Sequence, residues 1–266
     1  MATDRTLLEG LIDYAGVFPP ARHSLEKAVD LYRSAKAGPD GWVLGPFLCL
    51  ASQLPALGRL VAADETMATG VVLDIPIDQV ARSVDQIELK VDSGRFDYGP
   101  VSARAPVVYA ESRKPESLAF LESIKIARDR GLDVRAKIRT GGESAEAFPD
   151  VDTVAAFLIA CIADGIPFKA TAGLHHPFRH SSGVEGATEF GFVNLLAATR
   201  AALVDPSVLT ETLTASHAGD FDISTASWMG TGTHIEAGTV RSYLRSFGSC
   251  SFDEPAGYLR DLGMLA

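Results

Sequence analysis

The sequence predicts an α/β protein in which parallel strands alternate with helices, and two short strand-like runs are the main basis for this. They cover residues 134–142 and 167–177, and each contains one lysine, Lys137 in the first and Lys169 in the second. Between them, residues 152–164 have the composition of a helix, with an apolar run from Val154 to Ile162. Strand, helix and strand at this spacing indicate a parallel βαβ unit.

Each of the two strand-like runs also has one polar face, and an earlier run at 86–91 has one as well. Because side chains alternate along a strand, every second residue shares a face. The polar faces hold Gln86, Glu88 and Lys90; Arg135, Lys137 and Arg139; and Lys169, Thr171 and Gly173. In a doubly wound sheet, helices cover both faces and the strands are continuously apolar. One polar face per strand therefore predicts a single (β/α)8 barrel of parallel strands with a charged interior.

Length, composition and charge fit one large barrel. The chain has 266 residues and a mass of 28.2 kDa, and barrels of this type have about 250 residues in one domain. We therefore expect residues 1–266 to form a single domain that ends in a helix. The net charge of −10 argues against nucleic acid or an anionic membrane as a partner, because both bind basic surfaces. A small substrate, including an anionic one, remains compatible.

The sequence also predicts a cytoplasmic location. Residues 1–11 lack the apolar core of a signal peptide, and the longest apolar runs are too short to cross a bilayer. Cys49 and Cys161 lie in apolar runs, as expected for reduced core residues. The apolar C-terminal tail, which includes Leu259 and Leu265, could pack on its own barrel or on a second copy in a homo-oligomer.

The remaining elements follow from apolar runs and the turn residues between them. Beyond the runs already described, strands are expected at 13–18, 42–50, 69–75 and 106–111, and a last strand near 220–227 would close the barrel. Helices are expected from Ser24 to Gly38, at 52–63, 77–83, 115–131, 192–203 and 206–216, and from a capping box at Ser251 to Gly263. Residues 92–104 show no clear helix.

The predicted barrel brings many of the polar residues into one site. Active sites of (β/α)8 barrels lie at the carboxyl ends of the strands and in the loops that follow. That rule places Asp74, Glu88, Lys90, Glu111, Lys137, Arg139, Lys169 and Thr171 in or near one site. The long loop after the seventh strand, with His175, His176, Arg179 and His180, is expected to lie over it.

The two lysines carry the main chemical hypothesis. A charge buried in a barrel must be paired or neutral, and cations that face one another lower each other's pKa. A lysine close to neutrality is a nucleophile for carbonyl carbon, as Schiff-base catalysis requires, and Glu88 could move the protons. On the residues alone Lys137 and Lys169 are equally suited. The alternative is a structural ion-pair network with Glu88, Glu111 and Asp74.

The segment 85–174 resembles the deoxyribose-phosphate aldolases. Lys137, Thr140 and Gly141 resemble the family's Schiff-base strand, and Lys169 with Gly173 resembles the following strand, whose second lysine perturbs the first. Residues 85–88 resemble the family's fourth strand, which carries an acidic proton shuttle.

This resemblance implies a division of roles. Lys137 would be the nucleophile, Lys169 the partner that lowers its pKa, and Glu88 the proton shuttle, with no cofactor. Two departures point away from a phosphosugar substrate. Glu88 stands where the family usually has Asp, and residues 172–177 replace a glycine pair that helps to bind phosphate.

The first functional hypothesis is therefore a cofactor-independent lyase, similar to a class I aldolase, acting on a small oxygenated carbonyl compound. Arg139 and the loop from His175 to Arg179 would hold an anionic or hydroxylated substrate. Weaker candidates for the site are residues 13–16 and 231–234. Glycine-rich nucleotide-binding fingerprints are absent, which argues against a nicotinamide enzyme or an ATPase.

Two other hypotheses use the same barrel. A metal-dependent lyase, isomerase or hydrolase could use His175, His176 and His180 with Glu111, Asp74 or Glu185 as ligands. Adjacent histidines on extended backbone point in opposite directions, so joint ligation by His175 and His176 is not expected. The last hypothesis is a non-catalytic barrel that binds a small molecule.

Overall fold

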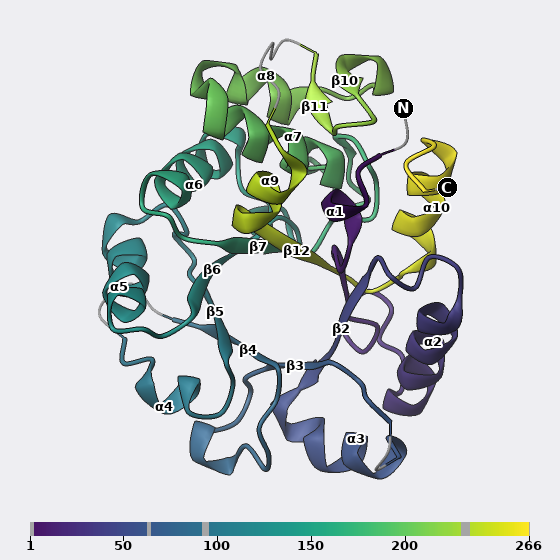
Figure 1. The fold of residues 1–266 in the computed structure, drawn as a ribbon, viewed down its shortest axis with the longest axis vertical. Coiled ribbons are helices and arrows are strands. Elements are labelled where there is room, and N and C mark those ends of the chain that lie inside the picture. Colours follow the sequence, from purple (N-terminus) through teal and green to yellow (C-terminus); the bar gives the residue numbers. More distant parts are fainter. Residues whose placement is uncertain (1–2, 63–64, 92–95, 230–234, 266) are drawn as a thin grey trace.

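The computed structural model describes residues 3–62, 65–91, 96–229 and 235–265, and eight parallel strands form a closed barrel at its centre (Figure 1). The predicted (β/α)8 barrel is therefore confirmed. The order of strands around the barrel is β1, β2, β3, β4, β5, β6, β7 and β12, and β12 pairs with β1 to close it. The strands are β1 Ile12–Tyr14, β2 Leu44–Leu50, β3 Thr69–Val72, β4 Gln86–Lys90, β5 Val107–Glu111, β6 Val134–Arg139, β7 Phe168–Thr171 and β12 Leu244–Ser249.

Helices surround the barrel (Figure 1). Polar caps start several of them: Ser24 Oγ accepts the N–H of Lys27 at 3.3 Å, and Asp150 Oδ1 accepts that of Thr153 at 2.7 Å. The helices are α1 Arg5–Leu8, α2 Leu25–Ala37, α3 Leu54–Leu60, α4 Gly99–Ser102, α5 Leu118–Asp129, α6 Val151–Ala163, α7 Phe192–Val204, α8 Leu209–Thr214, α9 Ala237–Tyr243 and α10 Asp253–Asp261. No helix in the described part of the chain has both the length and the apolar character needed to cross a membrane.

The predicted position of the last strand was wrong. Residues near 220–227 form a small antiparallel hairpin outside the barrel, β10 Phe221–Asp222 with β11 Ser227–Trp228. The closing strand is β12, whose inward positions carry Ser246 and Gly248 rather than bulky residues. A Cβ atom at Gly248 would lie 3.1 Å from Oγ1 of Thr171. The barrel interior has little room beside Gly248, so the inward positions of β12 carry small residues. β12 therefore lacks the alternating pattern by which the other strands could be recognised.

Smaller differences concern element ends. The first strand is Ile12–Tyr14 rather than 13–18, the segment 77–83 contains a short 3-10 helix at Ile77–Gln79, and α4 lies in the stretch 92–104 where no helix was expected. Between β7 and α7, β8 His180–Ser181 pairs with β9 Thr188–Glu189.

The C-terminal tail and the start of α10 answer two further expectations. Leu259, Met264 and Leu265 are buried in the core of the same chain, so the tail packs on its own barrel. Ser251 Oγ accepts the N–H of Glu254 at 3.3 Å, as the predicted cap requires. The carboxylate of Glu254 bonds to His175, however, rather than back to Ser251.

The two faces of the barrel strands separate as the alternation predicts. Ile87 and Leu89 of β4, like Ala136 and Ile138 of β6, are buried in the hydrophobic core. Between α6 and β7, the rings of Phe157 and Phe168 pack edge to face, with their centroids 5.3 Å apart. This is a favourable aromatic geometry. The opposite faces place their polar side chains inside the barrel, where the charged residues described next converge.

Candidate active site inside the barrel

Two lysines and one bridging carboxylate lie at the centre of the barrel. Lys169 is fully buried and pairs with Asp13 and with Glu88, whose Oε1 lies 2.6 Å from Nζ. Lys137, only 4% exposed, has Nζ 2.6 Å from Glu88 Oε2 and 2.8 Å from Glu111 Oε2. Glu88 thus uses one oxygen for each lysine.

Strand register explains why these residues meet. Lys137 pairs with Lys169 between β6 and β7, and Glu111 pairs with Lys137 between β5 and β6. Residues opposite each other in a ladder point to the same side, so all three side chains enter the barrel. Asp13 joins them because β1 closes the barrel next to β12.

The charges inside the barrel balance. Arg139 Nε lies 3.1 Å from Glu111 Oε1, which completes a chain of ion pairs. Its members are three cations, Lys137, Lys169 and Arg139, and three carboxylates, Asp13, Glu88 and Glu111. Pairing of this kind is what allows charges to be buried. The side chain of Arg139 is 41% exposed, so the chain of ion pairs runs from the buried centre to solvent.

Neutral groups complete the surroundings of Lys169 and Asp13. Ser246 Oγ donates to Asp13 Oδ2 at 2.9 Å, and Gln86 Nε2 lies 3.4 Å from the same oxygen. The ammonium of Lys169 also lies 5.1 Å from the centre of the Tyr109 ring, within the range of a cation–π contact. Lys169 is therefore enclosed by acceptors and by an aromatic face.

The carboxylates between the lysines control the pKa values. Burial alone would raise the pKa of Glu88, but Lys137 and Lys169 outweigh it and lower the pKa to about 2. Burial would lower the pKa of Lys169, but Asp13 and Glu88 outweigh it and raise the pKa. The expectation that facing cations lower each other's pKa is therefore wrong for Lys169, because a carboxylate separates it from Lys137.

This network predicts an acid-dependent loss of stability. The pKa of Glu88 falls from 4.5 to about 2 on folding, so its stabilising contribution is present above pH 4.5 and is lost as the pH falls through about 2. Lys169 has the opposite sign, and its contribution is lost only at a pH above its ordinary value of 10.5. We expect the free energy of unfolding of Glu88→Gln, measured with urea, to fall less steeply at acid pH than that of wild type. The same slope as in wild type and in the exposed control Glu122→Gln would contradict this.

Other predicted site residues lie at different distances from the network. Thr171 shares the inward face of β7 with Lys169. Lys90, the last residue of β4, is exposed and pairs in register with Glu111. Asp74 is exposed and accepts hydrogen bonds from the N–H and Oγ of Ser52, at 2.9 and 2.6 Å. Asp74 therefore stabilises the segment after β2 through these hydrogen bonds and does not belong to the lysine network.

The Thr-Gly pair after Lys137 joins two strand ends. Thr140 is fully buried, and its Oγ1 donates to the carbonyl oxygen of Ala172 at 2.6 Å. A Cβ at Gly141 would lie 3.2 Å from Cα of Gly173, which itself has a φ of +74°. Glycine is favoured at both positions because of close approach at one and left-handed backbone at the other.

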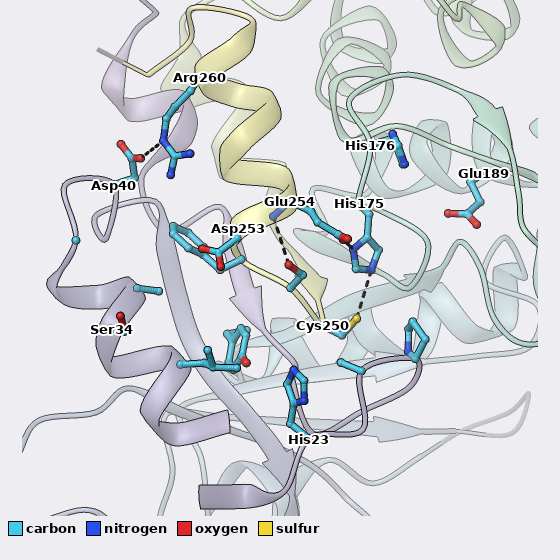
Figure 2. A pocket seen from close by; sticks show the side chains of 18 of the residues that line it. His23, Ser34, Asp40, His175, His176, Glu189, Cys250, Asp253, Glu254 and Arg260 are labelled. Atoms are coloured by element: carbon cyan, nitrogen blue, oxygen red, sulfur yellow. Dashed lines mark hydrogen bonds and ion pairs between the residues drawn. The ribbon is translucent and has the colours of Figure 1, made fainter. Parts of the chain in front are cut away.

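The histidine loop packs against α10 (Figure 2). His175 Nδ1 lies 2.5 Å from Glu254 Oε2. The ring of His176 contacts those of His180 and Tyr258, at centroid distances of 4.1 and 4.8 Å. Adjacent His175 and His176 thus have different partners. The guanidinium of Arg179 lies 4.5 Å from the Phe190 ring, and its contact with a substrate stays a prediction.

The described residues do not support the predicted metal ligands. Across these residues, no three or more His, Cys, Asp or Glu side chains are grouped so that they could hold a metal ion. The weaker candidates at 231–234 lie outside the residues that the structure describes.

A groove of about 830 Å³ lies beside the histidine loop (Figure 2). Residues that follow β1, β7 and β12 line it, together with parts of α2 and α10. Its lining includes Tyr14, His23, His175, Cys250 and Glu254. The six charged residues of the lysine network are not part of this lining.

Sequence reasoning gave Asp13 little weight and missed the pairing of His175 with Cys250. A lone carboxylate between Ile12 and Tyr14 is the signal that could have marked Asp13 as a partner for an interior cation. Cys250 directly follows β12. Because that strand was not predicted, the place of Cys250 at the rim of the barrel could not be predicted either.

The fold and the site define this chain as a (β/α)8 barrel protein with an ion-paired lysine–carboxylate interior. No protein-family model matches the sequence, and no curated protein matches it either.

Proposed function

We propose that this protein is a cofactor-independent lyase of the class I aldolase type, in which Lys137 forms a Schiff base with a small oxygenated carbonyl compound. The observation that carries the proposal is the Glu88 carboxylate, which lies 2.6 Å from the ammonium nitrogens of both Lys137 and Lys169. A nucleophilic lysine, a second lysine and an acid between them match the roles that the resemblance to deoxyribose-phosphate aldolases implies.

Position favours Lys137 over Lys169 as the nucleophile. Lys169 has no exposed surface and is enclosed by Asp13, Glu88 and the Tyr109 ring. Lys137 pairs with Glu111, the last residue of β5, and Glu111 in turn pairs with the half-exposed Arg139. A substrate that enters at the carboxyl ends of the strands meets Lys137 first.

The carboxylates beside Lys137 can handle the protons of imine formation. The Lys137 ammonium must lose a proton before it attacks, and Glu88 and Glu111 lie 2.6 and 2.8 Å away to accept it. The charge of Lys137 is one cause of the lowered pKa of both carboxylates, so they become better bases as that charge is lost. The amine nitrogen then bonds to the carbonyl carbon, and the carbonyl oxygen takes up two protons and leaves as water. The product is an iminium, which has the same charge as the ammonium it replaces. The balance of three cations and three carboxylates therefore survives.

Carbon–carbon cleavage uses the same proton carriers. The iminium withdraws the electron pair of the breaking bond while the β-hydroxyl of the substrate gives up its proton, which releases an aldehyde and leaves an enamine. The enamine takes a proton at carbon, and water hydrolyses the resulting iminium. Lys169 stays protonated throughout and holds Glu88 in place.

The mouth of the barrel suits an anionic or hydroxylated substrate. Arg139 and Lys90 offer exposed positive charge there, and Thr171 adds a hydroxyl. This supports a small-molecule partner, whereas the cytoplasmic location and a homo-oligomeric state stay predictions.

Arg139 supplies a prediction on substrate charge. We expect Arg139→Gln to raise KM for a carboxylate-bearing substrate by about tenfold or more, because a charged hydrogen bond contributes about 1.5–3 kcal/mol. A neutral substrate of equal size should keep its KM. Arg135→Gln is the matched control, because Arg135 lies on the same face of β6 but bonds to Asp133 and Tyr109. Equal changes for both substrates would contradict a contact with the anion.

Trapping of an imine with borohydride tests the proposed reaction class. The protein is incubated with small aldehydes, ketones and keto acids, with and without borohydride, and the mass of the intact chain is measured. A mass increase that needs both a carbonyl compound and borohydride supports an imine. Turnover that a chelator abolishes and added metal restores, without such an adduct, would favour the metal-dependent alternative. Thermal stabilisation by a ligand without turnover of any compound would favour a binding protein.

A further inference from the structure

Three groove residues that no step of the lyase proposal uses make a continuous chain of contacts. Cys250 Sγ lies 3.5 Å from His175 Nε2, and His175 Nδ1 lies 2.5 Å from Glu254 Oε2 (Figure 2). All three residues line the groove of about 830 Å³. A thiol, an imidazole and a carboxylate in this order have the arrangement of a nucleophile, its base and the group that orients the base.

The fold explains how these distant residues meet. Cys250 directly follows β12, and His175 lies in the loop after β7, which pairs with β12 in the barrel. Glu254 belongs to the first turn of α10, shortly after Cys250. All three therefore sit at the carboxyl end of the barrel, where barrel proteins place their chemistry.

The contacts on the two ring nitrogens of His175 determine the direction of its pKa shift. Burial would lower its pKa, but Cys250 and Glu254 outweigh burial and raise it to about 9. Nδ1 faces the carboxylate of Glu254, and Nε2 faces the sulfur of Cys250.

The other cysteines provide a contrast within the same chain. Cys49 and Cys161 are completely buried, and burial raises the pKa of both thiols, that of Cys49 to about 12. Neither lines the groove. Cys250 alone among the three has a histidine and an open groove beside it.

We propose that Cys250, His175 and Glu254 form a second reactive site that accepts an acyl group from a carboxylic ester or thioester. The sulfur attacks the carbonyl carbon while the one proton that lies between Sγ and His175 Nε2 is held on Nε2. The tetrahedral intermediate collapses to an enzyme thioester, and the leaving oxygen or sulfur takes the proton from His175. Water or a second nucleophile then releases the acyl group. No redox partner is needed, because only acyl and proton transfers occur.

The start of α10 offers groups to stabilise the intermediate. The first N–H groups of an α-helix have no acceptor within the helix, and Phe252 and Asp253 at the start of α10 lie two and three residues after Cys250. Both residues line the groove. They are the donors we expect to face the oxyanion. This site shares no residue with the lysine network, so either proposal can fail while the other stands.

The test uses the full-length protein and p-nitrophenyl acetate. We expect a burst of nitrophenolate equal in amount to the protein, with an acetyl thioester on Cys250 and none on Cys49 or Cys161 by peptide mass spectrometry. Acetylation should be at least about 100-fold faster than that of free N-acetylcysteine at the same pH, as a positioned base provides. A rate equal to or below that of the free thiol, or no acetyl group on Cys250, would overturn the proposal.

Variants separate a catalytic arrangement from a merely accessible thiol. Cys250→Ser should abolish the burst, His175→Asn should slow acetylation by at least about 100-fold, and Glu254→Gln should slow it less. The exposed control variants His217→Asn and Glu122→Gln should keep the wild-type rate. If His175→Asn folds normally and reacts as fast as wild type, the histidine has no role. If it does not fold, the comparison with N-acetylcysteine, which needs no variant, still decides.

Discussion

Replacing Lys169 with methionine is expected to lower the free energy of unfolding by about 3–5 kcal/mol, because removing one partner of a buried ion pair leaves an uncompensated charge. Asp13 loses its cation, while Glu88 keeps Lys137. Urea unfolding monitored by circular dichroism measures the change.

Two comparison variants make the test of Lys169 specific. Lys90→Met changes the same residue type at an exposed position, and it should alter the free energy of unfolding by no more than about 0.5 kcal/mol. Adding Asp13→Asn to Lys169→Met should recover part of the loss, because it removes the orphaned charge. A Lys169→Met protein as stable as Lys90→Met would show that the pairs with Asp13 and Glu88 do not stabilise the barrel.

Replacing Lys137 with alanine is expected to act mainly on catalysis. Turnover should fall by about 10³-fold or more, because the nucleophile is lost and only proton transfer and binding remain. The loss of stability should be smaller than for Lys169→Met, because Glu88 keeps Lys169 and Glu111 keeps Arg139. Steady-state kinetics on the compound that gives the imine, together with urea unfolding, measure both effects.

A charge-preserving variant separates the two roles of Lys137. Lys137→Arg keeps a cation between Glu88 and Glu111, but a guanidinium is not deprotonated in proteins and cannot form the imine. It should be closer to wild type in stability than Lys137→Ala and equally inactive. Activity within severalfold of wild type in either variant would rule out Lys137 as the nucleophile.

Much of the barrel could be predicted because alternation along a strand is a local property of the sequence. The runs around Glu88, Lys137 and Lys169 each show which side chains share a face, and the structure places those faces as expected. β12 could not be recognised in this way, because Ser246 and Gly248 give it a small interior face. The segment near 220–227, which was expected to close the barrel, belongs to a hairpin outside it.

The site was predictable only in part for a related reason. Glu88, Lys137 and Lys169 could be grouped from three strands, but the carboxylate that separates the lysines depends on register across the closed barrel. The direction of the pKa shift at Lys169 follows from that register and from Asp13. The contact of His175 with Cys250 depends on β7 and β12 being neighbours, which could not be known while the last strand was misplaced.

The most direct measurement is a peptide map of the protein after reduction with borohydride in the presence of the carbonyl compound that gives the largest adduct. Our account predicts a reduced adduct on Lys137, none on the fully buried Lys169, and no adduct in Lys137→Ala or Lys137→Arg. An adduct on Lys169, or no lysine adduct with a compound that the enzyme turns over, would contradict the assignment of Lys137 as the Schiff-base residue.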